Sequence, residues 1–168
     1  MFRARVLASL LLPLAGLFCA CSSNSSSNPA SAGNSGDAPS GNVGCSQMSG
    51  DAYLPGMQKL GDAGRYSFAL LSSTPAPPAL NDNTFILQVS DASGQAVPGE
   101  LSVALDMPEH GHSSPTEPTI VLDPDTNQFT LDPMNLFMVG LWRLTFSFQP
   151  ASGGAEQADS AVFKFCID

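Results

Sequence analysis

From position 65 to its end, the chain is dominated by short runs in which apolar and polar residues alternate. In the run 141–149, for example, Trp142, Leu144, Phe146 and Phe148 are separated by polar residues. A period of two places alternate side chains on opposite faces of a β-strand. Seven such runs are present, and Gly, Pro, Asn or Asp stands between them. We therefore expect strands at 65–72, 84–90, 100–107, 119–122, 128–131, 141–149 and 160–167.

The same pattern predicts the fold class. No stretch has the apolar spacing of an amphipathic helix, and no internal repeat is present. Several short strands separated by turns are typical of an antiparallel β-sandwich of immunoglobulin-like size. Residues 45–168 are numerous enough to bury a hydrophobic core. We predict that they form one all-β domain, an immunoglobulin-like antiparallel β-sandwich of about seven strands.

The N-terminus has the features of an export signal. Two arginines precede an apolar run over positions 6–18, which is shorter than the roughly 20 residues of a permanent membrane helix. The run ends in the sequence LFCAC, which resembles the lipobox of bacterial lipoproteins. Cys21 is the preferred lipidation site because the small Ala20 precedes it, although Phe18 fits less well than the usual Leu. Cys19 ranks second, and an ordinary secretory signal is the alternative.

A long polar segment separates this signal from the predicted strands. Residues 22–44 are almost all Ser, Asn, Gly, Ala and Pro, and they contain nothing that could form a core. A random coil of this composition would reach about 25–30 Å. We predict a signal peptide over 1–20 and a lipidated Cys21 that begins a flexible linker over 21–44. The protein would then be anchored in the bacterial envelope, on the outer membrane, facing the periplasm or the cell surface.

The remaining cysteines agree with an oxidising compartment. If residues 1–20 are removed and Cys21 carries lipid, only Cys45 and Cys166 are left. An even pair in an exported protein predicts a disulfide. A bridge between them would close almost the whole domain and contribute about 4–5 kcal/mol in the chain-entropy description.

The charge of the chain limits its partners. The formal net charge is −9, and it becomes −11 when residues 1–20 are removed, because that segment contains two arginines and no acidic residue. An acidic surface repels nucleic acid and anionic lipid headgroups. We expect no nucleic-acid partner, and we expect contact with a membrane through the lipid only.

Both histidines lie in one short segment, MPEHGH at 107–112. His110 and His112 would project to the same side of an extended backbone, and Gly111 would let the chain curl so that both rings approach one ion. Neutral imidazole suits copper, zinc or nickel, whereas the thioether of Met107 favours Cu(I). Glu109 adds a harder candidate ligand.

Two further methionines follow in a segment expected to be a loop, 131–138. Met134 and Met138 would reach the histidines if this loop lay at the same end of the sandwich. The predicted metal ligands are therefore Met107, His110, His112, Met138 and Met134, a set that suits copper. The alternative is a solvated histidine loop, with the methionines acting as core filler.

Four segments carry a resemblance to a known family: NTFILQV at 83–89, DASGQAVPG at 91–99, MPEHGH at 107–112 and FMVGLW at 137–142. Over roughly 64–150 their order resembles that of the YtkA-like domain family, and in part that of FixH-type proteins. The resemblance implies a small envelope β-sandwich that handles metal, copper in particular. Many members carry more methionine where this chain has EHGH, which leaves open the identity and oxidation state of the metal.

The chain lacks the signatures of an enzyme. Both histidines lie in one loop, and no nucleophile elbow, phosphate loop or dinucleotide fingerprint is present. We predict a non-catalytic protein with two alternative functions. The first is an envelope lipoprotein that binds or delivers copper through the Met/His segment. The second is a β-sandwich module, without metal, that has a structural role or binds an envelope protein.

Overall fold

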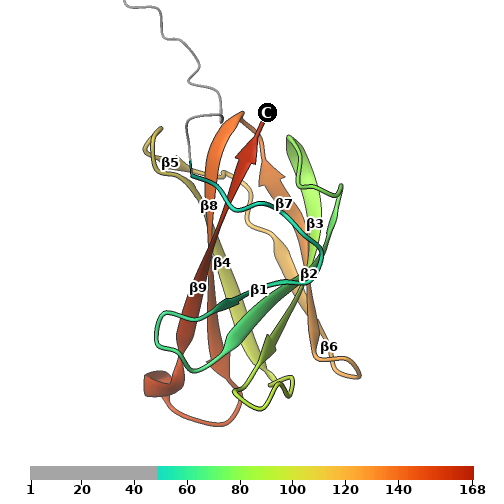
Figure 1. The fold of residues 1–168 in the computed structure, drawn as a ribbon, viewed down its shortest axis with the longest axis vertical. Helices are drawn as coiled ribbons and strands as arrows, with labels where there is room; N and C mark the ends of the chain where they lie inside the picture. The colour runs from blue at the N-terminus through green and yellow to red at the C-terminus, as the bar shows by residue number, and fades with distance from the viewer. Residues whose placement is uncertain (1–48) are drawn as a thin grey trace, which may run out of the picture. The chain divides into compact units, whose positions relative to one another are not determined.

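A computed structural model describes residues 49–168, and these residues form two packed β-sheets (Figure 1). The predicted signal peptide, the linker, Cys21 and Cys45 lie outside the described residues. Within 49–168 the strands are β1 (Met57–Leu60), β2 (Ser67–Thr74), β3 (Asn81–Ser90), β4 (Gly99–Met107), β5 (His112–Ser113), β6 (Thr119–Asp123), β7 (Gln128–Leu136), β8 (Gly140–Pro150) and β9 (Asp159–Ile167), with a short 3₁₀ helix, η2 (Ala155–Gln157), before β9.

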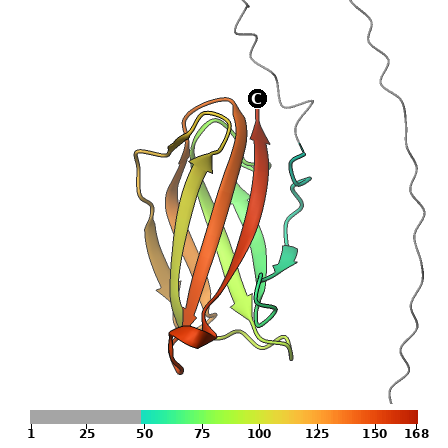
Figure 2. The same cartoon turned by 90° about the vertical axis from the view of Figure 1, so that its left-hand side faces the viewer.

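The two sheets are antiparallel throughout. One has the strand order β1-β2-β3-β7-β6 and the other the order β5-β4-β8-β9, and Figure 2 shows them as two layers. The predicted all-β sandwich is confirmed. All seven expected strands are present, and β1 and β5 are two short strands that the residue pattern did not predict.

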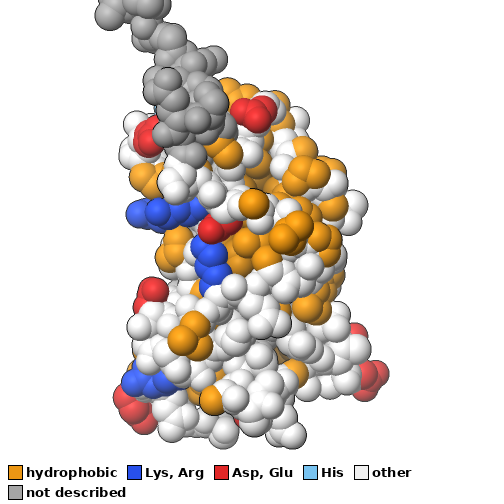
Figure 3. Space-filling model, in the orientation of Figure 1, with side chains coloured by type: hydrophobic (Ala, Val, Ile, Leu, Met, Phe, Trp, Pro, Cys, Tyr) orange, Lys and Arg blue, Asp and Glu red, His pale blue; other side chains and the backbone are white. Residues whose placement is uncertain are grey.

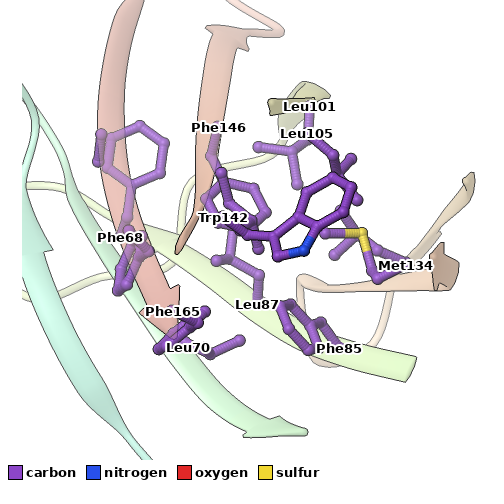
Figure 4. Packing of buried hydrophobic residues seen from close by; sticks show 14 of the residues in the cluster. Phe68, Leu70, Phe85, Leu87, Leu101, Leu105, Met134, Trp142, Phe146 and Phe165 are labelled. Atoms are coloured by element: carbon purple, nitrogen blue, oxygen red, sulfur yellow. The ribbon is translucent and has the colours of Figure 1, made fainter. Parts of the chain in front are cut away.

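The core lies between the sheets and is built by the alternation seen in the sequence. The four large side chains of β8, from Trp142 to Phe148, are at most 1% exposed, whereas the residues between them are partly or fully exposed. Trp142 packs among leucines and phenylalanines of both sheets (Figure 4). Large aromatic side chains bury about 150–250 Å² each. The core therefore holds Trp142, at the start of β8, in one fixed position.

Strand β7 is longer than the residue pattern predicts, because it runs through Asp132 and Pro133 to Leu136. The register of β3 against β7 shifts between Asn83 and Phe85, opposite these two residues. A proline has no N–H to donate to a neighbouring strand, and such a bulge is where a strand accommodates it. Most of the segment expected to be a loop, 131–138, is therefore strand.

The N-terminal segment covers the free edge of β9. The Asp51 amide donates to the carbonyl of Lys164 at 2.6 Å, and the Lys164 amide donates to the Asp51 carboxylate at 2.7 Å. Lys59 of β1 donates to the same carboxylate and to the carbonyl of Val162, at 2.5 and 2.8 Å. An uncovered strand edge invites pairing with another chain. These contacts protect the edge that β9 would otherwise present.

The surface carries few large apolar side chains. On the face shown in Figure 3, hydrophobic side chains are more frequent in the upper half than in the lower half. The most exposed large apolar residues of the described chain are Leu54, Leu60, Leu80, Val121 and Val139. Across residues 49–168, no helix has the length and apolar character needed to cross a membrane.

Candidate metal site

The histidine segment forms a tight hairpin between β4 and β5. Met107 is the last residue of β4, and it pairs with His112, the first residue of β5. The amides of His110 and Gly111 both donate to the Met107 carbonyl at 3.0 Å, and Gly111 has a φ of 67°. That backbone conformation favours glycine. The segment between β4 and β5 is thus a four-residue turn, and the short strand β5 is followed by a connection to β6.

The turn brings the two imidazoles side by side. The ring centroids of His110 and His112 are 5.8 Å apart, and the ring planes are inclined by 34°. His110 is exposed in the turn, whereas His112 is half-buried. The glycine between them allows this approach, because its positive φ reverses the chain within the turn.

Met107 lies directly beside this pair. Its side chain is completely buried. A β-carbon built on Gly140, the first residue of β8, would lie 2.8 Å from Met107 Cε and 3.7 Å from His110 Nε2. The thioether end of Met107 and a ring nitrogen of His110 therefore border the same glycine. A larger residue at position 140 would fill the space that they share.

Aromatic residues support His112 from the second hairpin, which joins β7 to β8. The rings of His112 and Phe137 have centroids 5.5 Å apart and planes inclined by 30°. Phe137 in turn packs against Trp142 in a T-shaped arrangement, with ring centroids 5.6 Å apart. The indole Nε1 of Trp142 donates to the Met138 carbonyl at 2.8 Å, which fixes this hairpin over the core.

Two buried side-chain nitrogens at this hairpin lack a hydrogen-bond partner among the described residues, one in His112 and the other the Nε atom of Arg143. The Nδ1 atom of His112 is buried, and it makes no hydrogen bond within the described part of the chain. Burying a polar atom without a partner costs about 1–3 kcal/mol. Such an atom in a native fold calls for an explanation, and a bound ion is one of the ordinary explanations.

The outer side of the hairpin is held by polar contacts. Asp106 accepts a hydrogen bond from the hydroxyl of Ser113 at 2.6 Å, and one from the guanidinium of Arg143 at 3.3 Å. Neighbouring side chains of a strand point to opposite faces. Asp106 and Ser113 therefore secure the hairpin from outside, while Met107 and His112 face the space between the sheets.

The structure places the other candidate ligands differently. Met138 is half-buried in the β7–β8 hairpin, next in sequence to Phe137, whose ring packs against His112. Met134 is completely buried in β7, and its thioether lies beside the indole of Trp142 (Figure 4). Glu109 is exposed in the turn. Among residues 49–168, no three His, Cys, Asp or Glu side chains form a group that could hold a metal ion. The ligand roles predicted for Met107, His110, His112, Met134 and Met138 all stay predictions.

The structure identifies two residues of the site that the candidate ligand set did not include. Gly140 leaves the space beside Met107, and Phe137 supports the ring of His112. Both belong to the sequence FMVGLW at 137–142, so the family pattern marked their positions but not their contacts.

One cysteine of the predicted disulfide lies within the described residues. Cys166 is half-buried in β9 beside Leu141 of β8. Because Cys45 lies outside the described residues, this bridge stays a prediction.

Fold and hairpins together define a small β-sandwich domain whose tip is lined by histidine and methionine. The family model described as YtkA-like matches residues 49–147, and the chain belongs to the YtkA-like family. No curated protein matches its sequence. A copper-bound variant of FetP from a uropathogenic Escherichia coli strain aligns with a TM-score of 0.43 and 13% identity, over 68% of this chain and 95% of its own. A likeness this low says nothing about what the present chain binds.

Proposed function

We propose that this protein binds copper between the two hairpins at the tip of its sandwich, and that it delivers the ion rather than catalysing a reaction. The observation that carries the proposal is the buried Nδ1 atom of His112, which has no partner among the described residues. A cation in this space would give that nitrogen a bond and remove the cost of burying it unsatisfied.

The chemistry of the neighbouring atoms favours copper. Two imidazoles and one thioether combine borderline and soft donors, a set that suits Cu(I) better than hard cations such as Mg²⁺ or Ca²⁺. The thioether of Met107 is completely buried, so water does not compete for it. Glu109, the carboxylate nearest in sequence to the histidines, is exposed in the turn.

Two aromatic side chains from the neighbouring hairpin and strand pack behind the ring of His112. Phe137 stands against His112, and Trp142 stands against Phe137. Phe137 makes a ring contact with His112, which limits the orientations that the imidazole can take. The hydrogen bond from Trp142 to the Met138 carbonyl keeps this support attached to the core.

We further propose that the protein works in the bacterial envelope, attached to a membrane by a lipid on Cys21. The export signal, the small residue before Cys21 and the polar segment 22–44 support this location. A tether of that length would let the tip exchange its ion with other envelope proteins at some distance from the anchor.

A titration of the purified full-length protein with Cu(I), under anaerobic conditions, tests the proposal. Trp142 is the only tryptophan of the chain, and its fluorescence reports on the site through Phe137. We expect a saturable change at one equivalent of Cu(I). At a free concentration about 100 times the Kd, binding should add about 2.7 kcal/mol of stability, or roughly 10 °C in Tm.

Matched variants make the result specific. His112→Ala should abolish the fluorescence change, whereas Met57→Leu, a half-buried thioether in β1, should leave it intact. Met134→Leu and Met138→Leu decide whether either residue adds a ligand. A wild-type protein whose fluorescence and Tm do not respond to Cu(I), or a His112→Ala variant that responds like the wild type, would overturn the proposal.

A further inference from the structure

The two imidazoles of the tip differ in burial and in support. Building on the proposed function, we propose that His112 is the fixed ligand of the copper ion, and that His110 is the exchangeable ligand, which leaves first when the ion passes to an acceptor. The two histidines would then divide holding and release between them, although they are only two residues apart.

His112 has little freedom to move. It lies in β5, paired with Met107 of β4, and its ring stands between those of His110 and Phe137. Phe137 is itself held by the buried Trp142. To withdraw its ring, His112 would have to give up its contacts with the rings of Phe137 and His110. The energy of that movement makes His112 the slower of the two ligands to leave.

His110 is held much less firmly. It lies in the exposed turn, where its backbone amide donates to the Met107 carbonyl. A β-carbon built on the neighbouring Gly111 would meet nothing within 4 Å, so the turn has open space beside it. Swinging the His110 side chain outward leaves the core and the strand pairing unchanged.

The exposure of the three donor residues to solvent also indicates that His110 is the ligand that leaves first. Met107 is completely buried and His112 is half-buried, so an acceptor approaching the tip meets His110 first. In the exchange, a donor atom of the acceptor forms a bond to the ion as the bond from His110 breaks. The electron pair of that broken bond stays on the imidazole nitrogen. The oxidation state of copper does not change, and no other reactant is needed.

Transfer kinetics test this division. Full-length protein loaded with one equivalent of Cu(I) is mixed with an excess of bathocuproine disulfonate, and the coloured chelate is followed by stopped flow. His110→Ala should still take up Cu(I), but it should release the ion about tenfold faster than the wild type, because affinity differences usually appear in the dissociation rate. His112→Ala should fail to hold the ion.

Phe137→Leu provides a second measurement if His112→Ala does not fold. By loosening the fixed ligand, it should weaken Cu(I) binding and leave His110 in place. The division of roles is overturned if His110→Ala loses binding as completely as His112→Ala. It is also overturned if His110→Ala releases the ion at the wild-type rate, or if Phe137→Leu binds Cu(I) like the wild type. A wild-type protein that holds no Cu(I) overturns the proposed function itself.

Discussion

Replacing Asp159 by Asn should destabilise the domain strongly, although the two side chains have almost the same shape. Asp159 begins β9 and is only 5% exposed. Its Oδ1 atom accepts the backbone amides of Ala63 and Ser160 at 2.8 and 2.9 Å, and its Oδ2 atom accepts those of Arg65 and Tyr66 at 2.8 and 3.1 Å. The carboxylate thus connects the turn between β1 and β2 to the start of β9.

The size of the effect follows from these four bonds. An Asn side chain has one acceptor oxygen, so it can retain one pair of amide donors. Its NH₂ group would take the place of the second carboxylate oxygen. The hydrogen atoms of that group would then face the N–H groups of the other two backbone amides. A buried donor that loses its acceptor costs about 1–3 kcal/mol. For two donors we expect the free energy of unfolding to fall by about 3 kcal/mol.

Urea unfolding at neutral pH, followed by the fluorescence of Trp142, measures this loss. Asp62→Asn is the matched control, because Asp62 is exposed in the same turn and its carboxylate accepts the Ser160 hydroxyl at 3.2 Å. That substitution should change stability by no more than about 0.5 kcal/mol. If the free energies of unfolding of the two variants differ by less than about 1 kcal/mol, the four hydrogen bonds from backbone amides to Asp159 stabilise the domain less than we expect.

Acid gives an independent check on the same carboxylate. Burial alone would raise the pKa of Asp159, but the backbone amides of Ala63, Arg65, Tyr66 and Ser160 outweigh it and hold the pKa below its ordinary value of 3.8. The unfolded chain then binds this proton more readily than the folded one. The stabilisation is complete above that ordinary value and is lost as the pH falls through the folded pKa. As the pH falls below 3.8, the wild type should therefore lose more stability than Asp159→Asn.

Two further predictions concern the tip and the anchor. A methyl group on Gly140 would meet Met107 Cε at 2.8 Å, on a backbone with a φ of 130°. Gly140→Ala should therefore lower the free energy of unfolding in urea by about 1–3 kcal/mol. It should also weaken Cu(I) binding. An unchanged affinity for Cu(I) would show that the space beside Gly140 is not part of the metal site. Cys21→Ala should abolish incorporation of radiolabelled palmitate in cells, whereas Cys19→Ala should retain it. The opposite outcome would make Cys19 the lipidated residue.

Most of the sandwich was predictable from the sequence because its strands are buried on one face. In β8 and β9, large side chains alternate with smaller or polar ones, and every one of them points where the alternation predicts. β1 escaped prediction because MQKL has no such contrast, and it is held instead by its pairing with β2 and by Lys59. β5 has only two residues, too few for a period to be seen.

The tip was only partly predictable, for a physical reason. The hairpin residues are neighbours in the sequence, so their spacing and Gly111 indicated that the rings could meet. The support of His112 depends on Phe137, which reaches it from a different hairpin. Spacing along the chain carries no information about that contact. The same holds for Asp159, whose amide partners include Ala63, 96 residues away.

The hairpin itself has a consequence for how the tip arises. Met107, His110 and His112 come from six consecutive residues, so an isolated peptide of this stretch would already carry three of the donor groups. Such a peptide would lose conformational entropy when it brought these groups together around an ion. It would also lack the contact between the ring of Phe137 and His112. The difference in affinity between peptide and domain would then measure how much of the binding free energy comes from the scaffold rather than from the donor atoms.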